Sequence, residues 1–175
     1  MRVRRRKHDV QEPISFADAA EAHLDDVYGY LVYLTGDRGL AEDLAAETFE
    51  KALRVWRHFD PARGSAKTWL CQLARTTALD HWRSERRRRG RENAYAREEP
   101  FAAEGPLVPG LSPDLERALL SLSAAEREVV ALRVLLELDG PTAARLLGIS
   151  ATACSTRLSR ALTRLEERMR DAVPA

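Results

Sequence analysis

The sequence predicts an all-α protein made of two small helical domains that are joined by a flexible linker. Apolar residues recur every three or four positions over residues 12–89 and again over 112–173, and nowhere do they alternate as in a β-strand. Between these stretches, residues 90–111 hold three Gly and three Pro with no helical period. Such a composition buries too little apolar surface to offset the entropy of ordering, so we expect a linker there.

The first domain is expected to hold three helices. Gly36 ends the first helix and Asp37 caps the second, whereas Asp60-Pro61 and Gly64 interrupt the pattern before Ser65 caps the third. Three packed helices of this length suffice for a small core. The side chains expected on the inner faces are Phe16, Ala20, His23, Leu24, Val27, Tyr28, Leu31 and Leu34, then Leu44, Ala45, Thr48, Phe49, Ala52, Leu53 and Trp56, then Leu70, Leu73, Ala74, Thr77 and Ala78.

The second domain is expected to begin at Ser112-Pro113, a cap followed by proline at the first helical position. Ser123 and Glu126 have the spacing of a capping box. Residues 140–162 then have the layout of a helix-turn-helix, in which Gly148 supplies a left-handed turn and Ser150 caps the last helix. We expect that helix to bury Leu158, Ala161, Leu162, Leu165 and Met169.

The opposite face of the last predicted helix carries hydroxyls and arginines that a DNA groove could reach. The alternative is an ordinary corner between two helices, with these residues only solvated. The residues concerned are Thr152, Ser155, Thr156, Arg157, Ser159 and Arg160.

Charge is segregated along the chain although the formal net charge is only +1. Basic residues crowd positions 2–7 and 83–91, and acidic residues crowd 21–50. This pattern favours a polyanion at one surface and a different partner at another. The alternative is that the arginine runs are solvated helix ends or tails.

The sequence contains few residue patterns that suit an enzyme active site or a metal site. Cys71 and Cys154 are isolated from histidine ligands, and no nucleophile triad, phosphate loop or carboxylate pair is evident. We therefore expect no cofactor, no metal and no catalysis. No apolar run approaches the length of about 18 residues that a membrane span needs, and the basic N-terminus lacks an apolar segment after it. A cytoplasmic protein without membrane insertion is expected.

Two long blocks resemble the small sigma-70 factors of the extracytoplasmic-function (ECF) group. Residues 34–83, LTGDRGLAEDLAAETFEKALRVWRHFDPARGSAKTWLCQLARTTALDHWR, resemble sigma region 2, and residues 119–169 resemble region 4. The resemblance implies a dissociable initiation subunit that binds core RNA polymerase, recognises and melts promoter DNA, and in many relatives is held by an anti-sigma factor.

By this resemblance, the second helix would dock on the clamp helices of core polymerase. A mixed acidic and apolar surface suits a protein partner and repels DNA, although these acids would also serve simply to solvate a bundle face. Ala46 stands where the family often has glutamine. The implied docking residues are Asp43, Leu44, Glu47, Thr48 and Phe49.

The resemblance also implies that the third helix and the loop of residues 59–65 open the −10 element and hold a flipped base. Trp69 is equally interpretable as a core residue, and Thr76 replaces the family's usual asparagine. Lys67, Arg75 and the run of arginines at 86–89 could hold phosphates. The implied −10 residues are Phe59, Lys67, Trp69, Gln72, Arg75, Thr76, Asp80 and Arg83.

Region 4 would read the −35 element through Thr152, Ser155, Thr156, Arg157 and Arg160. The family's recognition helix reads close to GTVKSRLHRA, whereas residues 152–161 read TACSTRLSRA, without the lysine. Two alternatives remain: a polymerase-independent helix-turn-helix regulator, and an interaction protein that keeps the sigma fold without reading promoters.

Overall fold

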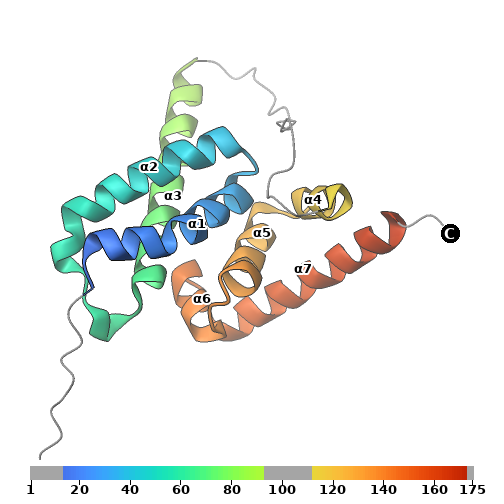
Figure 1. Ribbon diagram of the computed structural model, residues 1–175. Helices are drawn as coiled ribbons and strands as arrows, with labels where there is room; N and C mark the ends of the chain where they lie inside the picture. The colour runs from blue at the N-terminus through green and yellow to red at the C-terminus, as the bar shows by residue number, and fades with distance from the viewer. Residues whose placement is uncertain (1–13, 93–111, 173–175) are drawn as a thin grey trace, which may run out of the picture.

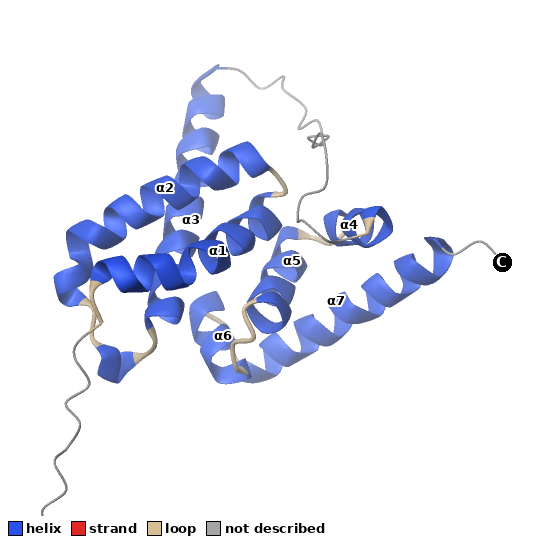
Figure 2. Cartoon of the chain, viewed as in Figure 1, coloured by secondary structure: helices blue, strands red, loops and turns tan. Residues whose placement is uncertain are grey.

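A computed structural model describes residues 14–92 and 112–172, and every regular element within these ranges is helical (Figure 2). The predicted linker lies mostly outside the described residues. The α-helices are α1 (Phe16–Thr35), α2 (Arg38–Val55), α3 (Ala66–Glu92), α4 (Pro113–Leu120), α5 (Ala124–Val130), α6 (Gly140–Leu147) and α7 (Ala151–Ala172). Two 3₁₀ turns, Trp56–His58 and Pro61–Arg63, separate α2 from α3, and a π-helical turn, Ala131–Leu135, follows α5.

Short-range signals set the helix ends as the sequence predicts. Gly36 and Gly148 end α1 and α6 with φ of 71° and 68°, a left-handed conformation that costs glycine little. Asp37 caps α2 by accepting from the Leu40 N–H at 3.0 Å. The capping box of Ser123 and Glu126 is complete at the start of α5.

In the first domain, α1, α2 and α3 pack against one another around a shared core. Small side chains at the contacts, such as Ala41 and Ala74, let the helices approach closely. Two predictions for this core are wrong: Leu24 and Leu53 are 51% and 58% exposed. Both belong to apolar stripes that face the open side of the α1–α2 pair rather than α3. The large buried side chains of this domain are Val27, Tyr30, Leu31, Leu44 and Leu70.

In the second domain, α7 packs along α4, α5 and α6 (Figure 1). The core between these helices holds Ala118, Leu119, Leu122, Val130, Ala161 and Leu165. The prediction that Leu162 is buried is wrong, since its side chain is 43% exposed. It follows Ala161 by one residue, about 100° around the helix, and so turns away from the core.

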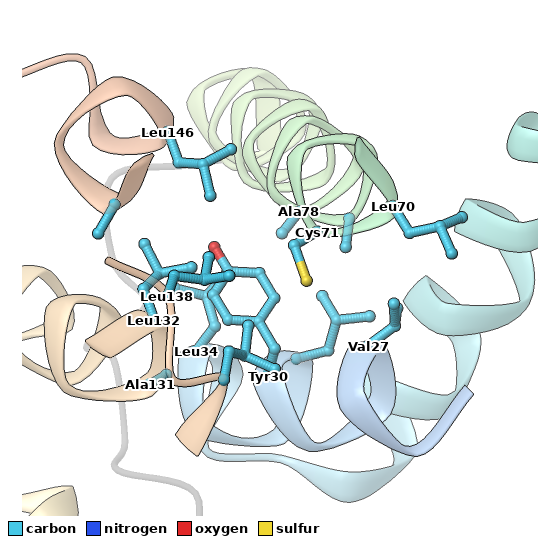
Figure 3. Packing of buried hydrophobic residues seen from close by; sticks show 14 of the residues in the cluster. Val27, Tyr30, Leu34, Leu70, Cys71, Ala78, Ala131, Leu132, Leu138 and Leu146 are labelled. Carbon is cyan, nitrogen blue, oxygen red and sulfur yellow. The ribbon is translucent and has the colours of Figure 1, made fainter. Parts of the chain in front are cut away.

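The two domains also pack against each other, which the sequence did not predict. Helix α1 contacts both α5 and the π-helical turn. Figure 3 shows Leu132, Leu138 and Leu146 of the second domain facing Tyr30 and Cys71 of the first, and all five belong to one continuous apolar cluster. At this interface a Cβ on Gly29 would lie 3.5 Å from Leu135 Cδ2.

Candidate nucleic-acid interface and docking surface

Fewer of the predicted docking residues lie on the surface of α2 than the sequence suggests. Asp43 and Glu47 are exposed and Phe49 is half-buried. Leu44 and Thr48 are 1% and 0% exposed, and the Thr48 hydroxyl donates to the Leu44 carbonyl at 2.6 Å. Residues four apart share one side of a helix, so 43 and 47 face outward while 44 and 48 face the core. Leu44 and Thr48 are therefore core residues that lie beneath the predicted docking surface and do not form part of it.

An apolar groove lies beside that surface, between α1 and α2. Its volume is about 710 Å³, and acidic residues lie along it: Glu21 and Asp25 on α1, Glu42 and Glu50 on α2. This groove was not predicted from the sequence, because the same apolar stripes were expected to face the core. Its apolar lining consists of Phe16, Ala20, Leu24, Tyr28, Ala45, Ala46, Phe49 and Leu53.

An aromatic cluster joins the end of α2, the following loop and the start of α3. The rings of Trp56 and Phe59 stack at a centroid distance of 4.7 Å. Trp69 meets Trp56 edge-on at 5.5 Å and lies 5.6 Å from Phe59. Trp69 is half-buried in this cluster and also lines a cleft. Its environment therefore has features of both a core residue and a surface residue that DNA could reach.

That cleft, of about 590 Å³, separates the first domain from α6. On one side it brings together four of the predicted −10 residues, Phe59, Trp69, Gln72 and Thr76. On the other side it is lined by Thr142, Arg145 and Leu146 of α6. Asp80 and Arg83 are exposed further along α3, where the Arg83 guanidinium donates to Asp80 at 3.1 Å. Stacking surfaces beside hydrogen-bonding groups suit an unpaired base.

Two predicted phosphate-binding cations are engaged within the protein. Lys67 Nζ lies 3.0 Å from Asp26 Oδ1 on α1. Arg75 Nε lies 2.8 Å from Glu128 Oε1 on α5, in the other domain. Neither side chain lines the cleft that holds Gln72. The structure therefore separates Lys67 and Arg75 from the residues grouped around Trp69.

The outward side of α7 carries the predicted −35 residues. Thr152, Ser155, Thr156 and Arg160 are exposed, and Arg157 is half-buried. All of them except Ser155 line a groove of about 560 Å³ between the first turns of α5 and α7.

A further cation, Arg164, lines that groove one helical turn after Arg160 and was not predicted from the sequence. Its guanidinium donates to Glu126 Oε1 at 2.5 Å. The Ser123 hydroxyl, which donates to the same carboxylate, holds the pKa of Glu126 below its usual range.

Metal and membrane features are not found in the described part of the chain. Residues 14–92 and 112–172 contain no group of three or more His, Cys, Asp or Glu side chains placed to hold a metal ion. Across the same residues, no helix is both long enough and apolar enough to cross a membrane.

Family models match both halves of the chain. Residues 19–88 match Sigma-70 region 2, and residues 113–165 match Sigma-70, region 4. The boundary between the two matches falls in the stretch that the sequence analysis assigned to the linker.

Individual relatives give the same assignment. The ECF RNA polymerase sigma factor SigF of Caulobacter vibrioides is 35% identical over 140 residues, which cover 79% of this chain and 76% of the relative. The ECF RNA polymerase sigma factor BldN of Streptomyces coelicolor is 32% identical over 164 residues, covering 91% of this chain. The chain spans 62% of BldN's length.

Among solved structures, the chain is similar to the sigma factor RpoE from Bartonella quintana, determined in complex with the anti-sigma factor NepR. The TM-score is 0.72 at 27% identity, with 89% of this chain and 96% of RpoE covered. Two helical domains, matched in order by both sigma-70 regions, and relatives of this similarity place the chain in the ECF group of the sigma-70 family of transcription initiation factors.

Proposed function

We propose that this chain recruits core RNA polymerase to promoters, and that its surfaces divide the work as their chemistry allows. Asp43, Glu47 and the acidic, apolar groove between α1 and α2 bind core polymerase. The cleft around Trp69 holds a base of the melted −10 element. The exposed side of α7 reads the −35 element. The protein acts in the cytoplasm, where polymerase and promoters are, and its role is regulatory rather than catalytic.

The observation that best supports this division is the grouping of Phe59, Trp69, Gln72 and Thr76 at one cleft. Opening a duplex costs stacking and pairing energy, which aromatic and hydrogen-bonding contacts to an extruded base offset. A regulator that binds only duplex DNA has no use for such a cleft. A polymerase-dependent melting factor needs one.

An anti-sigma factor is a further proposed partner. RpoE, whose fold matches most of this chain, was determined with its anti-sigma factor NepR. The acidic, apolar groove between α1 and α2 suits a basic amphipathic helix, whether from polymerase or from such a partner. Competition between core polymerase and the partner for this groove would keep the protein inactive.

The test is transcription in vitro from genomic fragments, with core polymerase and the purified protein, followed by mapping of the start sites. We expect defined start sites only when both are present, and little binding of the same fragments by the protein alone. Tight, sequence-specific duplex binding without polymerase would instead support an independent regulator. Absence of transcription from every fragment, with core binding intact, would support the sigma-fold interaction protein.

A further inference from the structure

A basic stretch near the N-terminus has no role in the surfaces described above. Residues 1–13, which we call the N-terminal segment, carry five cationic and two acidic side chains and lie outside the described residues. The cationic side chains are Arg2, Arg4, Arg5, Arg6 and Lys7. So high a density of positive charge is attracted to an anionic surface. The chain itself presents such a surface a few residues further on.

The groove between α1 and α2 leaves apolar surface uncovered. Leu24 and Leu53 line it and are 51% and 58% exposed. Three aromatic rings line it as well, those of Phe16, Tyr28 and Phe49. Arginine and lysine pack their methylene stems on apolar groups while their charged ends reach water, and a guanidinium stacks on aromatic faces. The apolar lining of the groove therefore suits cationic side chains as well as aliphatic ones.

Carboxylates along the same groove are available to bind the charged ends. Glu21, Asp25 and Glu42 are exposed, and none of the ion pairs found within the described ranges includes them. Glu50 pairs with Arg54 at 3.3 Å on the exposed side of α2, a kind of contact that contributes little. A cationic ligand would therefore gain these contacts without breaking a strong one.

The N-terminal segment joins the described chain at one end of this groove. It is followed by Ile14 and by Ser15, the N-cap of α1, and Phe16 already lines the groove. Helices α1 and α2 pack side by side, and along α1 the groove extends to Tyr28, about 18 Å at 1.5 Å per residue (Figure 1). Lys7 precedes Ser15 by eight residues, which span up to about 26 Å when extended. The cationic side chains can therefore reach the whole groove.

Attachment to the chain makes weak contacts sufficient. A segment tethered beside its binding site has an effective concentration there on the order of 1 mM. A dissociation constant of about 0.1 mM for the free segment would then keep the groove about nine-tenths occupied. Any other ligand of the groove must compete with the segment.

We propose that the N-terminal segment docks in the groove between α1 and α2 and competes there with core polymerase. This inference rests on the proposed function, which assigns the groove to polymerase. The docked segment lowers the affinity for core polymerase, and polymerase displaces it on binding. High salt weakens the docking, because ion pairs at an exposed groove are screened.

The first test locates the N-terminal segment in the full chain. A nitroxide is attached at Val3→Cys, and the native thiols stay unlabelled because Cys71 and Cys154 are each 1% exposed. Docking should broaden the amide NMR signals of Tyr28 and Glu42, at the end of the groove far from Ser15. The amide signal of Arg168 on α7 is the reference and should stay sharp.

Two comparisons separate docking from mere proximity and from contact between molecules. Arg4→Gln with Arg5→Gln and Arg6→Gln, the neutral-segment variant, should lose the broadening, and so should the parent chain at 1 M salt, where the Debye length is about 3 Å. Isotope-labelled chain without a nitroxide, mixed with spin-labelled chain, should show no broadening. Broadening in the mixture would assign the groove to a second copy and overturn docking within one molecule.

The second test measures competition with core polymerase. The neutral-segment variant should bind core with a dissociation constant about tenfold lower than that of wild type, which corresponds to 1.4 kcal/mol. Arg117→Gln with Arg168→Gln and Arg170→Gln removes the same three charges from exposed positions elsewhere and should bind as wild type. A synthetic peptide of residues 1–13 at about 1 mM should return the neutral-segment variant to wild-type affinity, and a peptide with the same three glutamines should not.

The outcomes separate this inference from the proposed function. Absent broadening, or equal broadening in the neutral-segment variant, would overturn the docking. Intact broadening with no gain in core affinity for the neutral-segment variant would overturn the competition, as would a peptide without effect. If no form of the chain binds core polymerase, the proposed function fails, while the broadening still decides whether the N-terminal segment occupies the groove.

Discussion

Glu126 ties the start of α5 to the middle of α7 by accepting from the Arg164 guanidinium at 2.5 Å while it completes the capping box with Ser123. One carboxylate therefore fixes the end of one helix and the direction of another. Arg164 lines the same groove as Arg157 and Arg160. The ion pair between Glu126 and Arg164 therefore sets the position of the proposed −35 surface relative to α5.

Glu126→Gln should lower the free energy of unfolding by about 1 kcal/mol at pH 7, since a hydrogen bond to a charged group is lost. The folded pKa of Glu126 lies below its unfolded value of about 4.3, so this stabilisation is present above pH 4.3 and disappears as the pH falls through the folded pKa. Urea unfolding followed by circular dichroism at pH 7 and pH 3 measures the difference. If Glu126→Gln is destabilised as much at pH 3 as at pH 7, the charge of the carboxylate is not the cause. The control, Glu167→Gln, should leave the free energy of unfolding unchanged at both pH values.

Reversing the charge of the α2 surface should weaken binding to core polymerase. Asp43→Lys with Glu47→Lys should raise the dissociation constant by about tenfold or more, because like charges placed together cost several kcal/mol. Both side chains are exposed, so helical content should not change. Fluorescence anisotropy of labelled protein titrated with core polymerase measures the effect. Glu167→Lys with Asp171→Lys on α7 is the control, and equal loss in both pairs would mean that the docking surface is elsewhere.

Residues at the Trp69 cleft should matter for opening DNA rather than for binding duplex. Gln72→Ala, an exposed change that should alter stability by less than about 0.5 kcal/mol, should slow open-complex formation on duplex promoters. A pre-melted promoter should restore most of the activity, since the cost of unstacking is already met. Trp69→Ala should show the same pattern with an added stability loss of about 3 kcal/mol, because the ring packs on Trp56 and Phe59.

Permanganate reactivity of unpaired thymines follows the opening, and a thermal melt of each variant accompanies it. The exposed Arg168→Ala on α7 should leave opening unchanged. If Gln72→Ala is equally impaired on duplex and pre-melted templates, the cleft acts in a step other than melting.

Arg157→Ala and Arg160→Ala should each reduce transcription from promoters that need a −35 element. An arginine that binds guanine with two hydrogen bonds contributes about 1–3 kcal/mol of discrimination, and its loss should relax the preference at one position. An arginine that binds phosphate should instead weaken all sequences alike and reduce the salt slope by about 1. Arg168→Ala lies beyond the groove on the same helix and serves as the control. Wild-type transcription by both variants would show that this face does not read DNA.

Local rules accounted for most of what the sequence predicted correctly. Helix ends depend on the few residues next to them, so they can be predicted from the sequence. Examples are the caps Asp37 and Ser123 and the glycines that end α1 and α6. The outward positions on α3 and α7 follow from helical spacing in the same way.

Long-range relations were the part that could not be predicted. The apolar stripes at Leu24 and Leu53 show that a helix side is apolar, but periodicity does not distinguish a core from a surface groove. Glu128 meets Arg75 53 residues away in the chain and Tyr30 98 residues away. An acidic residue in a helical pattern is expected at the surface, and only the packing of one domain on the other buries it.

The aromatic cluster has a spectroscopic consequence. The chain's three tryptophans are Trp56, Trp69 and Trp82, all in the first domain, and two of them belong to that cluster. Tryptophan fluorescence will therefore report mainly on the first domain and on the cleft that Trp69 shares with α6, whereas far-ultraviolet circular dichroism reports on the helices of both domains. A mismatch between the two unfolding curves would reveal independent melting of the second domain, and an extruded base that stacks on Trp69 should quench emission without any added dye.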